Sequence, residues 1–160
     1  MAAAEAGARA RAARAALGEA AARAKGDELR EACKRKDVAA ALRLIDEGAH
    51  PDCASPSGNS PLTWASVYEE LDSVAARLVA AGAKLDPVDP TESTSALTYA
   101  CATKRAATAL LLVEAGAAIN QVSNDGRSAL DRANEKGLAA VSAAIRARGG
   151  RTGAETRAGK

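Results

Sequence analysis

The amino-acid sequence predicts an all-α protein, a solenoid of stacked helix-turn-helix units with projecting loops. Two observations lead to this prediction. Alanine accounts for 44 of the 160 residues and aromatic residues for only 2%, a composition that suits closely packed short helices and gives a β-sandwich little to bury. A motif of serine, proline or alanine, and leucine also recurs at nearly constant spacing, in SPLTWA, SALTYA and SALDRA. Repeats of this length stack and share one core.

The first 26 residues form an alanine- and arginine-rich segment that we expect to be a helix preceding the repeats. The segment also resembles an organellar transit peptide, although it has no serine and carries Glu5 and Glu19. We therefore expect a cytoplasmic protein, with a plastid or mitochondrion as the alternative. Gly26 is expected to separate this segment from the repeats, and the segment is expected to add little to their stability.

Each repeat unit is expected to contain two helices and a loop. Serines that suit helix N-caps open three inner helices, at Ser60, Ser95 and Ser128. Glycines that suit the left-handed C′ position follow the outer helices at intervals of 34 residues, at Gly48, Gly82 and Gly116. Four residues after these glycines stand Asp52, Asp86 and Asn120. The second unit has one extra residue, which we place in the inter-helix turn near YEELD.

The two end units differ from the middle two. The first unit begins at Asp27 and lacks the proline-leucine opening, and the fourth ends at Gly149-Gly150 with Arg146 in place of an apolar residue. Their greater polarity is typical of units that cap a solenoid and face water on one side. We expect residues 27–150 to form the repeat domain and residues 151–160 to be a basic flexible tail.

These features resemble the ankyrin repeat over roughly residues 27–150. The tetratricopeptide repeat shares the period but has no place for a long loop with two prolines such as Lys84–Glu92. The sequence departs from the ankyrin pattern where a histidine usually follows the leucine, because Thr63, Thr98 and Asp131 stand there. Shorter groups must then make the hydrogen bonds of that histidine, or those bonds are lost.

The resemblance implies a non-catalytic protein-protein interaction module, acting as an adaptor or as an accessory subunit of a larger assembly. It implies partner contacts at loop tips and at inner helix ends. The loop-tip candidates are Asn59, Glu92, Thr94, Asp125 and Arg127. The helix-end candidates are Lys34, Arg35, Val67, Tyr68, Thr103, Glu135 and Lys136. Trp64 and Tyr99 occupy equivalent positions that the resemblance places between repeats, so we expect a structural role for them rather than a binding role.

The charge distribution suggests an alternative function. Residues 1–26 and 146–160 each carry five basic residues, whereas the central part of the chain has a formal net charge of −5. Basic ends attract nucleic acid or an anionic membrane surface, so the alternative is an electrostatic adaptor.

We find no sequence pattern for catalysis, a cofactor, a metal or a small-molecule substrate. Cys33, Cys53 and Cys101 are widely spaced, which favours a reducing compartment over a disulfide framework. Cys33 and Cys101 are expected to pack in the core. His50 and Cys53 are close in sequence, but neighbours in an extended loop point apart, so we expect no nucleophile-base pair there.

Overall fold

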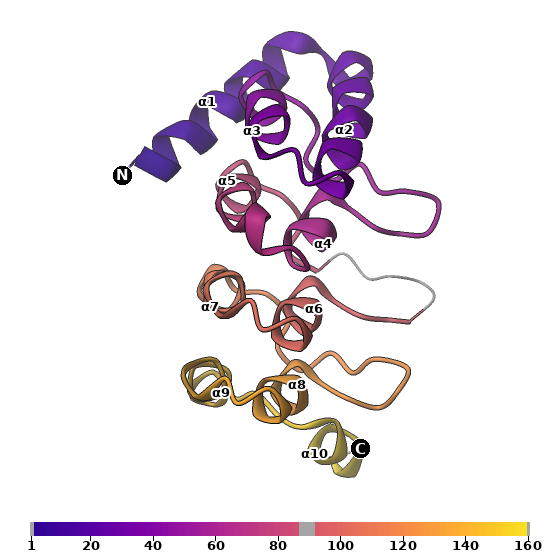
Figure 1. Cartoon of the computed structure of the whole chain (residues 1–160), viewed down its shortest axis with the longest axis vertical. Helices are drawn as coiled ribbons and strands as arrows, with labels where there is room; N and C mark the ends of the chain where they lie inside the picture. Colours follow the sequence, from indigo (N-terminus) through magenta and orange to yellow (C-terminus); the bar gives the residue numbers. More distant parts are fainter. Residues whose placement is uncertain (1, 87–91, 160) are drawn as a thin grey trace.

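The computed structural model describes residues 2–86 and 92–159, whose helices stack in two columns (Figure 1). Each inner helix packs against the outer helix of its unit and against the next inner helix. The inner column contains α2 (Glu19–Lys34), α4 (Pro61–Ala65), α6 (Ala96–Ala102) and α8 (Ala129–Glu135). The outer column contains α3 (Val38–Asp46), α5 (Asp72–Ala80), α7 (Ala106–Ala115) and α9 (Ala139–Ala147). The predicted all-α solenoid is confirmed.

One hydrophobic core runs between the two columns. The repeated leucines Leu62, Leu97 and Leu130 are fully buried. Alanines occupy the equivalent contact positions one turn further along the inner helices, at Ala65, Ala100 and Ala133, and they are fully buried as well. The alanine side chain is a single methyl group, so successive inner helices can approach closely at these positions.

The predicted N-cap serines begin three inner helices. The hydroxyl oxygens of Ser60, Ser95 and Ser128 accept hydrogen bonds from the backbone N–H groups three residues later. Thr63 completes a capping box by accepting from the backbone N–H of Ser60 at 3.3 Å. The shorter residue in place of the expected histidine therefore supports the start of its own helix.

The repeated Asp and Asn residues link successive loops. Asp52 accepts a hydrogen bond from the backbone N–H of Lys84, and Asp86 accepts one from Ala118, both at 2.8 Å. Asn120 accepts in the same way from Arg151 at 2.7 Å. This ladder connects each projecting loop to the next one and explains why the sequence repeats a short acceptor four residues after the glycine.

The turns between inner and outer helices differ in unit two. Lys36 and Lys104 take left-handed backbone conformations with φ of 61° in the turns of units one and three. Unit two instead forms the 3-10 helix η1 (Glu69–Leu71) after a shorter α4, which places the extra residue where the sequence predicted it. This turn carries Tyr68 at the N-cap position of η1.

The N-terminal segment is helical, as the sequence predicted, but its packing and its junction with the first unit differ from the prediction. The helix α1 (Ala2–Leu17) packs against α5, α3 and α2, with Gly7 and Ala10 buried. α2 begins at Glu19 and continues through Gly26, so this glycine lies inside a helix and does not mark a boundary. Gly26 is buried against the loop that carries Cys53, where a side chain would not fit. The segment is therefore part of the packed structure.

The last residues also differ from the predicted flexible tail. Thr152 caps a short helix, α10 (Gly153–Ala158), which lies below α8 at the end of the stack (Figure 1). The Asp131 carboxylate accepts from the backbone N–H of Gly153 at 2.6 Å, and Arg157 donates to the Gly126 carbonyl at 3.0 Å. These bonds hold α10 beneath the last inner helix.

Candidate protein-binding face

All three aromatic residues of the chain lie on the inner column or in its turn. Trp64 lies on α4 and Tyr99 at the equivalent position of α6, while Tyr68 follows α4. Each is half-buried. The fully buried core of the described residues consists of Ala, Leu, Ile, Val and Cys side chains, and Trp64 and Tyr68 pack against its edge.

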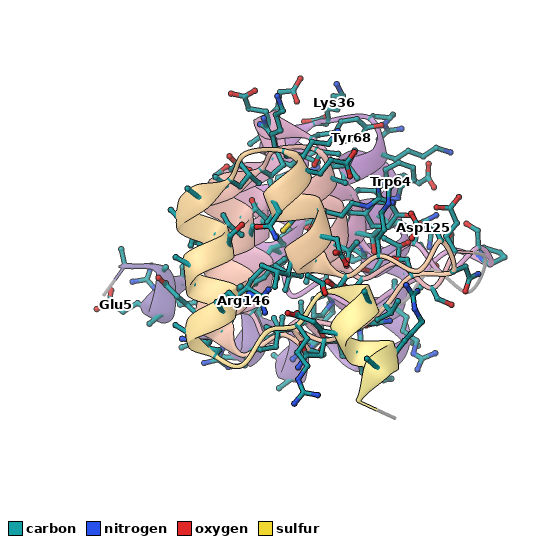
Figure 2. The ribbon with its side chains drawn as sticks, turned by 90° about the horizontal axis from the view of Figure 1, so that it is seen from below. Glu5, Lys36, Trp64, Tyr68, Asp125 and Arg146 are labelled. Atoms are coloured by element: carbon teal, nitrogen blue, oxygen red, sulfur yellow. The ribbon has the colours of Figure 1, made fainter. Side chains whose placement is uncertain are left out.

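Trp64, Tyr68 and Lys36 form one cluster. The two rings are stacked, with centroids 6.0 Å apart and planes inclined by 4°. The Lys36 Nζ lies 4.3 Å from the centroid of the Tyr68 ring. Figure 2, viewed along the stack, shows these side chains on the side bounded by the inter-helix turns and the projecting loops. We call this side the concave face. Contacts of this kind hold the rings in place, which lowers the entropy that a partner would lose on binding.

Ion pairs connect the turns of neighbouring units. Lys36 lies 3.4 Å from Glu70, and Arg105 lies 3.0 Å from Glu69. A backbone hydrogen bond and the nearby Lys36 lower the pKa of Glu70. The acidic turn of unit two is therefore held between basic residues of units one and three.

The structure gathers most of the predicted helix-end residues along this row of turns. Lys34 and Arg35 are exposed at the end of α2, and Val67 is half-buried beside Tyr68. Thr103 differs from the others, because its hydroxyl donates to the carbonyl oxygens of Tyr99 at 2.8 Å and Ser66 at 3.1 Å. Its polar group is used within the fold.

The predicted loop-tip residues divide into exposed and engaged positions. Glu92 is exposed. Asn59 is half-buried and donates to Ser57 Oγ at 3.2 Å. Thr94 is not at a loop tip, because it is only 7% exposed and its hydroxyl donates to Ser123 Oγ at 3.2 Å. It supports the contact between two loops.

The candidates of unit four are joined by an ion-pair network. Arg127 lies 3.0 Å from Glu135, and Arg132 pairs with Asp125. Arg132 also lies 3.7 Å from Glu135. The charges of Asp125, Arg127 and Glu135 are thus balanced inside the unit, while Lys136 stands half-buried beside them without an ion pair among the described residues.

Comparison with protein families identifies the repeat. The family described as ankyrin repeats, in three copies, matches residues 29–123. This chain belongs to the ankyrin-repeat family. Comparison with curated protein sequences found no match. Ankyrin repeats are generally protein-protein interaction modules and are typically non-catalytic.

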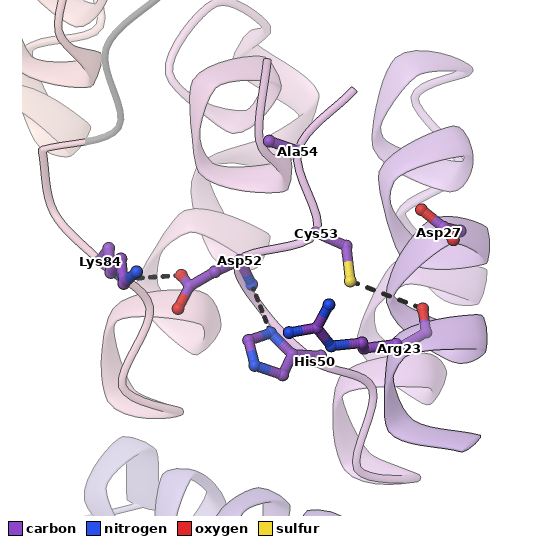
Figure 3. Close-up of a pocket in the computed structure, with 7 residues that line it drawn as sticks. All are labelled: Arg23, Asp27, His50, Asp52, Cys53, Ala54 and Lys84. Atoms are coloured by element: carbon purple, nitrogen blue, oxygen red, sulfur yellow. Dashed lines mark hydrogen bonds between the residues drawn. The ribbon is translucent and has the colours of Figure 1, made fainter. Parts of the chain in front are cut away.

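A polar hollow at the first loop of the ankyrin stack contains His50 and Cys53 (Figure 3). His50 Nδ1 accepts from the backbone N–H of Asp52 at 3.2 Å, whereas Cys53 Sγ donates to the Arg23 carbonyl at 3.5 Å. Burial and the nearby Asp27 raise the pKa of Cys53. The two side chains make separate contacts, and the thiol is not activated.

The other two cysteines lie in the ankyrin core. Cys33 and Cys101 are fully buried, and burial raises the pKa of each to about 12. Both remain protonated thiols that act as small packing residues, as the sequence indicated.

Residues 2–86 and 92–159 contain neither a candidate metal site nor a helix suited to span a membrane. No cluster of three or more His, Cys, Asp or Glu side chains in this region could hold a metal ion. None of its helices combines the length and apolar character that a membrane span requires.

Several arginines of the basic ends are engaged within the ankyrin fold. Arg11 donates to the Ala80 carbonyl, and Arg148 donates to the Val113 carbonyl. Arg146 forms an ion pair with Glu155 at 2.9 Å. These arginines belong to the basic ends on which the electrostatic-adaptor alternative rests, and their bonds within the fold leave fewer of them free to contact nucleic acid or a membrane.

Sequence reasoning missed two members of the candidate face. It assigned Trp64 to packing only, although this residue both contacts the core and stacks on Tyr68. It did not select Lys36, which contacts Tyr68 across two units. The sequence did carry a signal for this face. The chain has only three aromatic residues, and each of them stands in or next to an inner helix.

Proposed function

We propose that this ankyrin-repeat chain is a non-catalytic adaptor or accessory subunit that binds a protein through its concave face, centred on Trp64, Tyr68 and Tyr99. The observation that carries the proposal is the placement of Trp64 and Tyr68 on this face (Figure 2), with Tyr99 at the position of α6 equivalent to Trp64, whereas the fully buried core contains no aromatic residue. Tryptophan and tyrosine are enriched among the residues that dominate binding energy at protein interfaces.

The geometry supports a centre in units two and three. Trp64 and Tyr68 are already stacked, and Tyr99 occupies the equivalent position one unit further on. Each ring keeps part of its surface exposed, so a partner can cover it without rearranging the helices. Stacked repeats form a rigid scaffold, which favours binding without refolding.

The test compares affinity purifications with the full chain and its variants as bait. Trp64→Ala and Tyr68→Ala should each lose most of the partner recovered by the unchanged chain, because removal of an interface hot-spot residue costs about 2 kcal/mol or more. Glu114→Ala, an exposed position on α7 in the outer column, is the matched control and should retain the partner.

Each variant also needs a thermal melt, because both aromatic residues contact the core. The proposal fails if folded Trp64→Ala and Tyr68→Ala proteins recover the same partners as the control. Recovery that is insensitive to the aromatic variants but falls steeply with salt would favour the electrostatic alternative, in which the basic ends contact nucleic acid or an anionic membrane.

A further inference from the structure

Unpaired cations flank the aromatic centre of the concave face. We call residues 34–37, 67–70, 103–105 and 135–137 the turn edge, since they form the row of inter-helix turns. Among the described residues, four charged side chains of this edge make no hydrogen bond or ion pair, namely Lys34, Arg35, Lys104 and Lys136. Lys34 and Arg35 lie in unit one, and Lys104 and Lys136 lie in units three and four.

The acidic residues of the turn edge are all engaged. Glu69 and Glu70 pair with Arg105 and Lys36. Asp37 caps α3 by accepting from the backbone N–H of Ala40 at 2.9 Å, and Glu135 pairs with Arg127. The charge left over along the edge is positive, although the central part of the chain is acidic as a whole.

We propose that the partner segment bound on the concave face is an extended acidic peptide, with an apolar or aromatic residue placed over Trp64 and Tyr68. The proposal rests on the function proposed above and adds the chemistry of the partner. Its charge is complementary to Lys34 and Arg35 on one side of the aromatic pair and to Lys104 on the other. Unpaired surface cations attract an oppositely charged partner and fix its register.

The distance between neighbouring repeat units determines how many peptide residues separate the side chains that contact successive units. Neighbouring packed helices lie roughly 8–10 Å apart, and an extended chain advances about 3.3 Å per residue. One repeat unit therefore corresponds to about three peptide residues. An acidic residue opposite unit one, an apolar residue opposite unit two and an acidic residue opposite unit three give the pattern acidic-x-x-apolar-x-x-acidic.

Unit two excludes acidic residues from the centre of this pattern. The turn of unit two offers an acidic residue no unpaired cation, because Arg105 and Lys36 are already paired with Glu69 and Glu70. The pattern is symmetric about its apolar residue, so it fits the face in either chain direction.

The experiment uses two fluorescein-labelled peptides of identical composition with the full chain. The matching peptide is Glu-Gly-Ser-Phe-Gly-Ser-Glu, and its isomer, Gly-Ser-Glu-Phe-Glu-Ser-Gly, brings both acids next to the Phe. Fluorescence polarisation should show at least about fivefold tighter binding of the matching peptide, and its binding should weaken as salt rises from about 50 to about 300 mM.

Charge-reversal variants test the predicted contacts. Lys34→Glu combined with Lys104→Glu should weaken binding of the matching peptide about tenfold. Arg9→Glu combined with Lys84→Glu changes the net charge equally at exposed positions away from the turn edge, and should leave binding within about twofold. If the first pair of changes destabilises the fold, Lys34→Gln with Lys104→Gln replaces it, with the same direction of effect.

The outcomes separate the partner chemistry from the function. Equal binding of the two peptides, no binding of either at about 1 mM, or equal loss in both charge-reversal pairs would overturn the acidic-peptide proposal. If Trp64→Ala still loses its partner in the purification, the concave face remains the binding site and only the partner class is wrong. If Trp64→Ala and Tyr68→Ala keep all partners, the proposed function itself fails.

Discussion

Gly7→Ala tests whether α1 is docked on the ankyrin stack. A Cβ at Gly7 would lie 2.5 Å from the carbonyl carbon of Ala80 and 2.9 Å from its Cβ, where ordinary contacts begin at 3.4 Å. Ala80 is the last residue of α5, which is anchored by the fully buried Leu78. The clash is therefore with backbone that cannot yield, and α1 must shift by roughly 1 Å.

Two effects of opposite sign decide the result. Alanine in place of glycine within a helix stabilises it by up to about 1 kcal/mol. Overpacking at a close contact costs about 1–3 kcal/mol, and a gap of up to about 1 Å removes a quarter to a half of the dispersion energy at the interface. The cost cannot exceed the free energy of docking α1, because the helix can detach instead. We expect a net destabilisation of about 1 kcal/mol.

The assay is thermal unfolding followed by circular dichroism. For a chain of this length, about 1 kcal/mol corresponds to a fall of the melting midpoint of roughly 2–4 °C. Ala8→Gly is the matched control at an exposed position of α1, and it changes helix propensity in the opposite direction without touching α5. Deletion of residues 2–17, which leaves α2 intact, should lower the midpoint further than Gly7→Ala.

A rise of the midpoint in Gly7→Ala would refute this reasoning. It would mean that the close approach of Gly7 to Ala80 imposes no penalty and that helix propensity alone decides the effect of the substitution. The control makes this result interpretable, because Ala8→Gly lowers the stability of α1 by propensity whether or not the helix is docked.

Three further perturbations test the stack and its C-terminal end. Leu62→Ala should destabilise the protein by about 2–4 kcal/mol in urea unfolding, because Leu62 is fully buried between helices; a loss below about 1 kcal/mol would contradict its core position. Asp86→Ala should cost about 1 kcal/mol through loss of the bond to the Ala118 N–H, and faster hydrogen exchange at that amide would be the local sign. Arg146 and the backbone N–H of Thr152 lower the pKa of Glu155 from 4.5 to about 2. A carboxyl with a depressed folded pKa stabilises the fold above its unfolded pKa and loses that effect as pH falls through the folded value. The attachment of α10 should therefore weaken between about pH 4.5 and about pH 2, and hydrogen exchange in Glu155→Gln should show no such transition.

The repeat architecture was predictable because it depends on local signals. Ser60 must cap a helix start and Leu62 must be buried, and both requirements recur in each unit at the same offset. The ladder through Asp52 was visible as a repeated residue, but its partner, the backbone N–H of Lys84, carries no side-chain signal.

Docking of α1 was not predictable from hydrophobic patterning. The contact is made where side chains are smallest, at Gly7 against Ala80 and at Gly48 against the backbone of α1. A segment dominated by alanine has no apolar stripe that distinguishes a docked face from an exposed one. Close backbone approach, rather than side-chain area, decides the packing, and this depends on the positions of α3 and α5 in space.

The aromatic cluster follows from the same use of alanine. Trp64 and Tyr68 are four residues apart, and the backbone makes one further turn after α4 ends at Ala65, because the N–H of Tyr68 donates to the Trp64 carbonyl at 3.3 Å. The extra residue of unit two and the turn η1 place Tyr68 beside Trp64 and next to Lys36 of the preceding unit. Because alanines bring the helices close, the large rings lie at the edge of the core and not among its fully buried residues. In a chain of this composition, an aromatic residue therefore indicates a position at the edge of the core, and this supports the concave face as the proposed binding site.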